Sequence, residues 1–233
     1  MRRIAPISFH LALACLIAVP ALSGCRDPLA TPDSYAPEAG VFDAGAGDDA
    51  GPGQACPEGT PDLFNNAYNP YFGGDEGVYL EVVVIGYFRC PHCAAFAFTL
   101  KDLWASRPDY QDHVRVYFHH FPFENATAYE LHGATVAADN QGMEYFWGMH
   151  DALYEGMVSD PVDYLELEDL RELAEGYGLD MDKWETDRSS QATIDFLVWD
   201  KEQAKALGVT GTPSVFVCGE KIIRSQIEEI LDG

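Results

Sequence analysis

A strand–helix–strand pattern in the middle of the chain limits the fold more than any other feature of the sequence. Residues 80–87 are apolar and rich in β-branched side chains, which is typical of a buried strand. A helix is expected over residues 91–106. A second strand is expected over residues 114–120, where apolar side chains alternate with Arg115, Tyr117 and His119. This order predicts a βαβ unit with parallel strands and a right-handed crossover.

Two cysteines lie where the first strand gives way to the helix, in the tetrapeptide Cys90-Pro91-His92-Cys93. Cysteines with two residues between them can close and reopen a small disulfide, which makes a two-electron redox centre. A helix N-terminus stabilises the thiolate of Cys90, and Pro91 suits the first helical position. The ring of His92 can donate to the sulfur of Cys90 or carry positive charge beside it. The motif therefore predicts a site of disulfide exchange.

Other interpretations of the cysteine pair remain open. Half of a structural zinc site would need a second close pair of ligands, and the sequence has no second Cys-x-x-Cys. His119 and His120 are adjacent in the expected strand and point to opposite faces, so they are poorly placed to share a metal. No metal is expected. An inert structural disulfide and two buried thiols are the remaining alternatives.

The remainder of the chain reads as a helical stretch followed by a hairpin. Helices are expected over residues 127–140, 143–155, 167–176, 181–189 and 191–207, with Gly208 as a C-terminal cap. Strands at 214–218 and 221–225 around a turn at Gly219-Glu220 form the hairpin, and residues 226–231 form a short last helix. In the helix over 191–207 the expected buried stripe comprises Ile194, Leu197, Val198, Ala204 and Leu207.

The N-terminal region reads as an export signal and a tether. Basic residues precede an apolar stretch over residues 11–21, and Leu22-Ser23-Gly24-Cys25 resembles the bacterial lipobox, in which the cysteine is lipidated. We expect a lipoprotein signal peptide over 1–24 and a lipid anchor on Cys25. A retained membrane helix and a plain secreted protein are the alternatives. Residues 25–55 are rich in Ala, Gly, Pro and Asp and are expected to form a flexible acidic tether.

The cysteine count fits an oxidising compartment. Of six cysteines, Cys15 leaves with the signal and Cys25 takes the lipid. Once the redox pair is set aside, Cys56 and Cys218 remain and could form a structural disulfide, with two unpaired thiols as the alternative.

The net charge of −24 at neutral pH argues against a nucleic-acid partner and against attraction to anionic lipid. It is typical of a strongly solvated surface.

The order of these motifs resembles the DsbA-like branch of the thioredoxin superfamily. The agreeing features are the Cys90–Cys93 tetrapeptide, the strand end at 118–122, the stretch Met149-His150-Asp151-Ala152-Leu153, and the run over 207–213 that ends in Gly211-Thr212-Pro213. The resemblance implies an α/β, thioredoxin-like fold over residues 56–233, with a helical insertion at about 124–207 capping the active site.

The resemblance also assigns roles. Cys90 would be the exposed nucleophile and Cys93 the buried resolving thiol. Pro213 would be a cis-proline beside them, with Thr212 offering its backbone to an extended client chain. A trans-proline that starts a strand is the alternative for Pro213. The sequence departs from the family at Val84, where a buried acid is usual six positions before the first cysteine.

These features predict an enzyme that exchanges thiols and disulfides on exported proteins, most simply by oxidising client dithiols. A reductase or isomerase that works from the reduced state is one alternative. A non-enzymatic module that binds polypeptides or a metal is another. No cofactor is expected beyond the Cys90–Cys93 disulfide. The expected partners are client proteins with thiols or disulfides and a membrane redox partner, and the expected location is the periplasmic face of a bacterial membrane.

Overall fold

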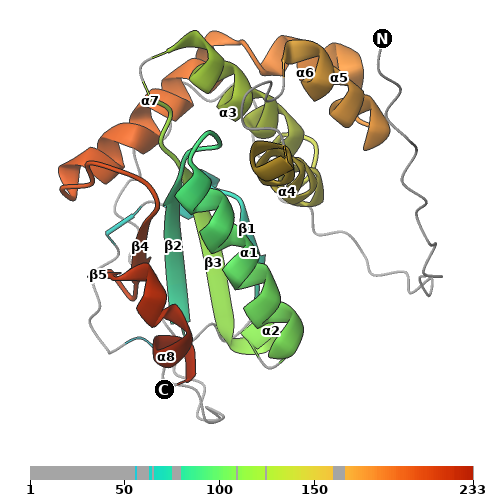
Figure 1. Cartoon of the computed structure of the whole chain (residues 1–233). Coiled ribbons are helices and arrows are strands. Elements are labelled where there is room, and N and C mark those ends of the chain that lie inside the picture. Colours follow the sequence, from blue (N-terminus) through green and yellow to red (C-terminus); the bar gives the residue numbers. More distant parts are fainter. Residues whose placement is uncertain are drawn as a thin grey trace.

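A computed structural model describes residues 56, 63–64, 66–74, 80–108, 110–123, 125–159 and 166–232. The expected signal peptide (1–24) and the whole of the expected tether (25–55), including Cys25, lie outside the described residues. Figure 1 shows a sheet with helices on its faces and a group of helices beyond one of its ends.

The elements in chain order are η2 (Asn66–Tyr68), β1 (Tyr71–Gly73), β2 (Leu80–Gly86), α1 (Pro91–Ser106), α2 (Tyr110–His113), β3 (Val114–His120), α3 (Ala126–Asp139), α4 (Met143–Ser159), α5 (Leu167–Gly176), α6 (Met181–Asp187), α7 (Gln191–Ala206), β4 (Ser214–Val217), β5 (Glu220–Ile222), η3 (Arg224–Gln226) and α8 (Ile227–Asp232).

The sheet has five strands in the order β1-β3-β2-β4-β5. Strands β2 and β3 are parallel, with Val82 opposite Val116, and the other neighbouring pairs are antiparallel. The predicted βαβ unit is thus present at the centre of the sheet. The edge strand β1, the short helix α2 and the turn η2 were not predicted.

The central strand β2 is buried on both faces, which explains its unbroken apolar sequence. Val82 and Val84 pack with apolar residues of α1 and α8 on one face. Val83 and Ile85 pack on the other face with Phe64 and with Ala204 of α7. These two layers hold the end of β2, and therefore the start of α1, in a fixed place.

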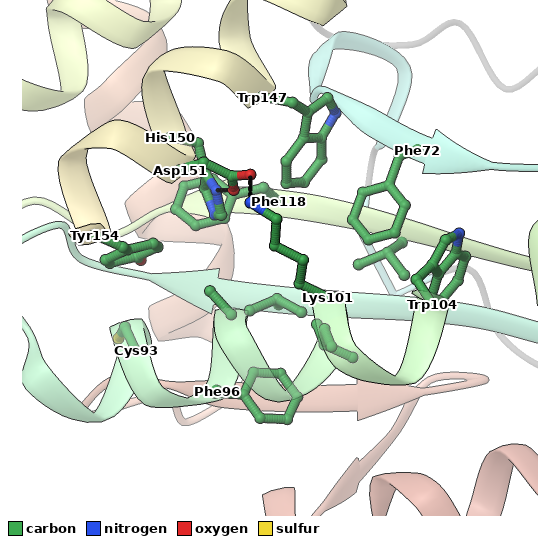
Figure 2. A pocket seen from close by; sticks show the side chains of 14 residues that line it. Phe72, Cys93, Phe96, Lys101, Trp104, Phe118, Trp147, His150, Asp151 and Tyr154 are labelled. Carbon is green, nitrogen blue, oxygen red and sulfur yellow. Dashed lines mark hydrogen bonds and ion pairs between the residues drawn. The ribbon is translucent and has the colours of Figure 1, made fainter. Parts of the chain in front are cut away.

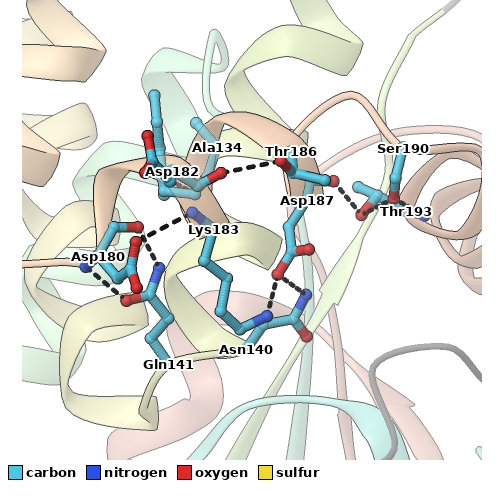
Figure 3. A network of polar contacts seen from close by, with 11 residues as sticks. Ala134, Asn140, Gln141, Asp180, Asp182, Lys183, Thr186, Asp187, Ser190 and Thr193 are labelled. Carbon is cyan, nitrogen blue, oxygen red and sulfur yellow. Dashed lines mark hydrogen bonds and ion pairs between the residues drawn. The ribbon is translucent and has the colours of Figure 1, made fainter.

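Helices α3 to α6 form a second core that also contains Cys90 and Cys93. The largest buried side chain there is Trp184, whose Nε1 donates to the carbonyl of Ala134 at 3.0 Å. Polar contacts join the end of α3 to α6, as Figure 3 shows. Gln141 and Asp180 exchange two hydrogen bonds of 3.1 and 2.8 Å, and Asn140 donates to Asp187 at 3.3 Å.

The stripe expected on α7 is partly wrong: Leu197 and Ala204 are buried as expected, but two other members are not. Ile194 and Val198 are 37% and 43% exposed. The buried face lies one step around the helix and comprises Thr193, Phe196, Leu197, Asp200, Lys201 and Ala204. A charged residue is buried there because it has partners inside the protein, which the apolar pattern alone did not reveal.

The hairpin turn also differs from its expected position. Val217 pairs with Glu220, so the two-residue turn is Cys218-Gly219 rather than Gly219-Glu220. Both turn residues have positive φ, 48° for Cys218 and 75° for Gly219, as a tight two-residue hairpin requires.

Candidate active site

The cysteine pair lies at the junction of β2 and α1, as predicted. Cys90 is the N-cap of α1 with extended backbone (φ −103°, ψ 111°), and Pro91 follows at the first helical position. The backbone N–H of Cys93 donates to the sulfur of Cys90 at 3.3 Å. The sulfur thus satisfies one of the N–H groups that every helix N-terminus leaves without a partner.

Both thiols are buried, with Cys90 9% and Cys93 3% exposed, so the expectation that Cys90 is the exposed one is wrong. Their pKa values nevertheless shift in opposite directions. Hydrogen bonding with the Cys93 side chain, together with bonds from Thr212 and from backbone N–H groups, lowers the pKa of Cys90 from 9.0 to about 5, against the opposing effect of burial. Burial, followed by the hydrogen bond to Cys90, raises the pKa of Cys93 far above its ordinary value. At neutral pH Cys90 is therefore a thiolate and Cys93 a thiol.

The peptide bond between Thr212 and Pro213 is cis, and it lies beside the cysteines. The carbonyl of Thr212 is 3.3 Å from the sulfur of Cys90, although 122 positions separate the two residues in the chain. Both Thr212 and Pro213 are partly exposed. The arrangement leaves a short backbone segment accessible next to the reactive sulfur.

The ring of His92 does not have the role expected for it, which was to interact with the sulfur of Cys90. Its side chain is exposed, and its contribution to the lowered pKa of Cys90 comes from its backbone N–H. Its carbonyl accepts a hydrogen bond of 3.4 Å from Arg224 in η3.

The pairing of Cys56 with Cys218 is confirmed. Their Cα atoms are 5.3 Å apart and a disulfide joins them. Cys218 follows the end of β4 opposite to Ser214, the residue next to Pro213. This disulfide therefore stands apart from Cys90 and Cys93, which are both free thiols.

Comparison with known proteins decides the family. The family model described as Thioredoxin matches residues 71–232, which is most of the chain. The chain belongs to the thioredoxin family. A "Probable disulfide bond formation protein D" of Bacillus anthracis is 27% identical over 148 residues, which are 63% of this chain and 68% of that protein. A "Thiol:disulfide interchange protein DsbA" of Pseudomonas aeruginosa is 26% identical over 142 residues, 60% of this chain and 64% of that protein.

Solved structures agree on the fold of this thioredoxin-family chain. The thiol-disulfide exchange protein α-DsbA2 from Wolbachia pipientis superimposes with a TM-score of 0.61 at 18% identity and covers 73% of this chain and 89% of that one. Within this DsbA-like group, two free thiols with opposite pKa shifts at the start of α1 form a thiol–disulfide exchange centre.

The thioredoxin-family core also contains a buried polar cluster that the sequence did not predict. Asp200 of α7 accepts hydrogen bonds from His119 Nδ1 at 2.6 Å, from the backbone of His120 at 2.5 Å and from Asn69 at 3.0 Å. All four residues are almost fully buried. The paired histidines at the end of β3 were the only signal, since their partner lies 80 positions away. As expected, the two histidines point to opposite faces, and His120 Nδ1 lies 2.8 Å from His132 Nδ1.

Within the part of the chain that the structure describes, no group of three or more His, Cys, Asp or Glu side chains is arranged to hold a metal ion. None of the helices formed by these residues has the length and apolar character needed to cross a bilayer.

Proposed function

We propose that this chain oxidises dithiols of exported proteins at the Cys90–Cys93 disulfide. A client thiolate attacks the sulfur of Cys90, the Cys90–Cys93 bond breaks, and a mixed disulfide forms. A second client thiol then attacks the mixed disulfide and releases Cys90. The client loses two electrons and two protons; the enzyme takes up the electrons, Cys93 keeps one proton, and the other proton passes to solvent because Cys90 remains a thiolate.

The lowered pKa of Cys90 is the observation that carries the direction of this proposal. A pKa of about 5 means that the reduced enzyme holds a stabilised thiolate at neutral pH. Stabilisation of the reduced form makes the disulfide form a stronger oxidant. A reductase would need the opposite balance, so the site supports oxidation of clients better than their reduction.

Client binding is proposed at the cis-proline loop. The carbonyl of Thr212 lies within 3.3 Å of the reactive sulfur, and Thr212 and Pro213 are partly exposed. An extended client segment could pair with the backbone of Thr212 as an added strand, which would place a client cysteine against Cys90.

The location is proposed from the N-terminal sequence. The lipobox-like Leu22-Ser23-Gly24-Cys25 supports lipidation of Cys25 after removal of residues 1–24, and residues 25–55 would hold the domain away from the membrane. A membrane redox partner would then reoxidise Cys90 and Cys93. Mass spectrometry of the mature N-terminus should find a lipidated Cys25; an unmodified cysteine or another start would contradict the anchor.

Equilibration with glutathione redox buffers tests the direction of electron flow. We expect a reduction potential less negative than about −200 mV, toward the oxidising end of the superfamily. A potential near about −270 mV, typical of a reducing thioredoxin, would contradict the proposal.

Two cysteine variants assign the roles of Cys90 and Cys93 in exchange with a model peptide. Cys90→Ser should abolish oxidation of a dithiol peptide. Cys93→Ser, given the disulfide form of the peptide, should hold a mixed disulfide, because the Cys90 thiolate opens the peptide disulfide and no Cys93 thiol remains to release the peptide. Activity retained in Cys90→Ser would contradict the scheme.

A further inference from the structure

Cys93 must gain a proton each time the active-site disulfide opens. When a client attacks Cys90, the electron pair of the broken S–S bond moves to the sulfur of Cys93. That sulfur is only 3% exposed, and burial raises its pKa far above the ordinary value, so a bare thiolate there is strongly disfavoured. A thiolate of high pKa is also a poor leaving group. The reaction therefore needs a proton supply that reaches the buried side of Cys93.

A cavity of about 290 Å³ opens on that side. Cys93 and Val84 line it together with aromatic side chains, and its titratable lining groups are Lys101, His150, Asp151 and Tyr154. In Figure 2, Cys93 and Phe96 border the cavity from α1, while His150 and Asp151 border it from α4. The volume has room for several water molecules at about 30 Å³ each, and the polar lining groups can hydrogen-bond to them.

A hydrogen bond with Asp151 orients the ring of His150 so that its other nitrogen can accept a proton. It is 6% exposed, and its Nδ1 lies 3.1 Å from Oδ1 of Asp151. Because a carboxylate accepts, Nδ1 carries the hydrogen and Nε2 keeps its lone pair. Oδ2 of Asp151 accepts from Lys101 Nζ at 2.7 Å, and these two side chains are 37% and 56% exposed. The pairing thus fixes the ring of His150 on the wall of the cavity.

The surroundings of His150 set its charge. The titratable groups facing it are Asp151 and Tyr154 on its own helix, Lys101 and Cys93 on α1, and His120 on β3. Burial lowers the pKa of His150 below 6.5 although Asp151 opposes the shift. Burial acts to raise the pKa of Asp151, but hydrogen bonds from His150 and Lys101 lower it overall. At neutral pH a neutral imidazole therefore stands beside a carboxylate that can stabilise its protonated form.

We propose that His150, oriented by Asp151, relays the proton to and from Cys93 through water in this cavity. His150 takes up a proton at Nε2, and Asp151 stabilises the imidazolium. The proton then passes through water to the sulfur of Cys93 as the S–S bond breaks, and the reverse transfer removes it when the disulfide re-forms. The relay would replace the buried acidic residue that is usual in the family at the position of Val84. His150 is a positioning residue, since it acts on the reacting sulfur through water, and the inference rests on the proposed exchange reaction.

The test is the rate at which dithiothreitol reduces the oxidised protein, followed by stopped-flow across acidic to neutral pH. We expect His150→Gln to slow the reduction by at least about 10-fold, because general acid catalysis is lost. When rates are expressed per dithiothreitol thiolate, the wild-type rate should rise as pH falls below 6.5 and the variant rate should not. The potential in glutathione buffers should stay unchanged, because a relay alters the rate and leaves the equilibrium alone. Adding Val84→Glu to His150→Gln should restore part of the lost rate.

A second variant of the relay and a control variant complete the test. Asp151→Asn, at a partly exposed position, should slow the reaction in the same direction and decides the matter if His150→Gln does not fold. His113→Gln is the matched control, because this half-buried histidine of α2 does not line the cavity, and it should keep the wild-type rate. Folded His150→Gln and Asp151→Asn proteins with the wild-type rate and pH profile would overturn the relay while leaving the exchange function intact. A wild-type protein that exchanges no thiols would instead overturn the proposed function.

Discussion

At the residue scale, two sulfurs of the same type acquire opposite chemistry from their positions in one helical turn. Both sulfurs belong to the same apolar core, but Cys90 caps α1 and accepts the backbone N–H of Cys93, whereas Cys93 lies inside the first turn. The pKa of the first thiol falls and that of the second rises. In the proposed exchange reaction this difference makes the sulfur of Cys90 the one that reacts with clients, and Cys93 the one that has to gain a proton.

The buried carboxylate of Asp200 leads to a prediction about stability. Asp200→Ala would leave the N–H donors of His119, His120 and Asn69 without their acceptor inside the core. We expect a loss of about 3–5 kcal/mol in the free energy of unfolding, measured by urea denaturation. Glu202→Ala on the exposed side of α7 is the control and should change it by no more than about 0.5 kcal/mol. Equal effects of the two substitutions would show that Asp200 does not hold the fold together.

At the scale of elements, strands β2 and β3 and helix α1 could be predicted closely from the sequence, because each carries a strong local signal. The strands are apolar or alternating, and α1 begins with a cap and Pro91. The short elements β1 and α2 have no such signal. β1 is stabilised by distant groups: Trp147 donates to the carbonyl of Tyr71 at 2.9 Å, and its ring packs against Phe72.

The candidate site divides in the same way. The cysteine pair and the Thr212–Pro213 loop could be predicted because each forms a short motif. The cavity beside Cys93 and the Asp200 cluster could not, because residues from well-separated strands and helices meet only in the folded chain. The face of α7 was mispredicted for this reason, since Asp200 and Lys201 replace apolar residues on its buried side.

Adjacent positions on α7 test the corrected face. Leu197 is fully buried and Val198 is 43% exposed, although the apolar pattern placed both inside. Leu197→Ala should lower the free energy of unfolding by about 2–5 kcal/mol, and Val198→Ala by no more than about 0.5 kcal/mol. Thermal and urea unfolding of the two variants would measure this. A larger loss for Val198→Ala would contradict the observed orientation of the helix.

At the scale of the whole molecule, the structural disulfide and the redox pair lie at separate places in the same small fold. The Cys56–Cys218 bond closes a loop across 162 positions and ties the start of the described chain to the hairpin. It therefore restricts the unfolded chain strongly. The redox pair lies at the other end of β4, in one core with residues of helices α3 to α6.

The ionisation of Cys90 also links redox state to the stability of the whole molecule. Its pKa is lowered on folding, so the reduced protein gains stability that is fully present above pH 9.0 and is lost as the pH falls through about 5. The oxidised protein has no such group. The equilibrium constant for oxidising a dithiol of ordinary pKa should therefore fall as the pH falls from 9.0 toward about 5, because that reaction releases a proton only while Cys90 stays a thiolate.

Alkylation of the reduced protein by iodoacetamide as a function of pH measures the ionisation of Cys90 directly, since only the thiolate reacts. Cys90→Ser provides the control, because Cys93 alone should stay unreactive over the same range. We expect a half-maximal rate near pH 5 for the wild-type protein. A half-maximal rate near the ordinary value of 9.0 would contradict it.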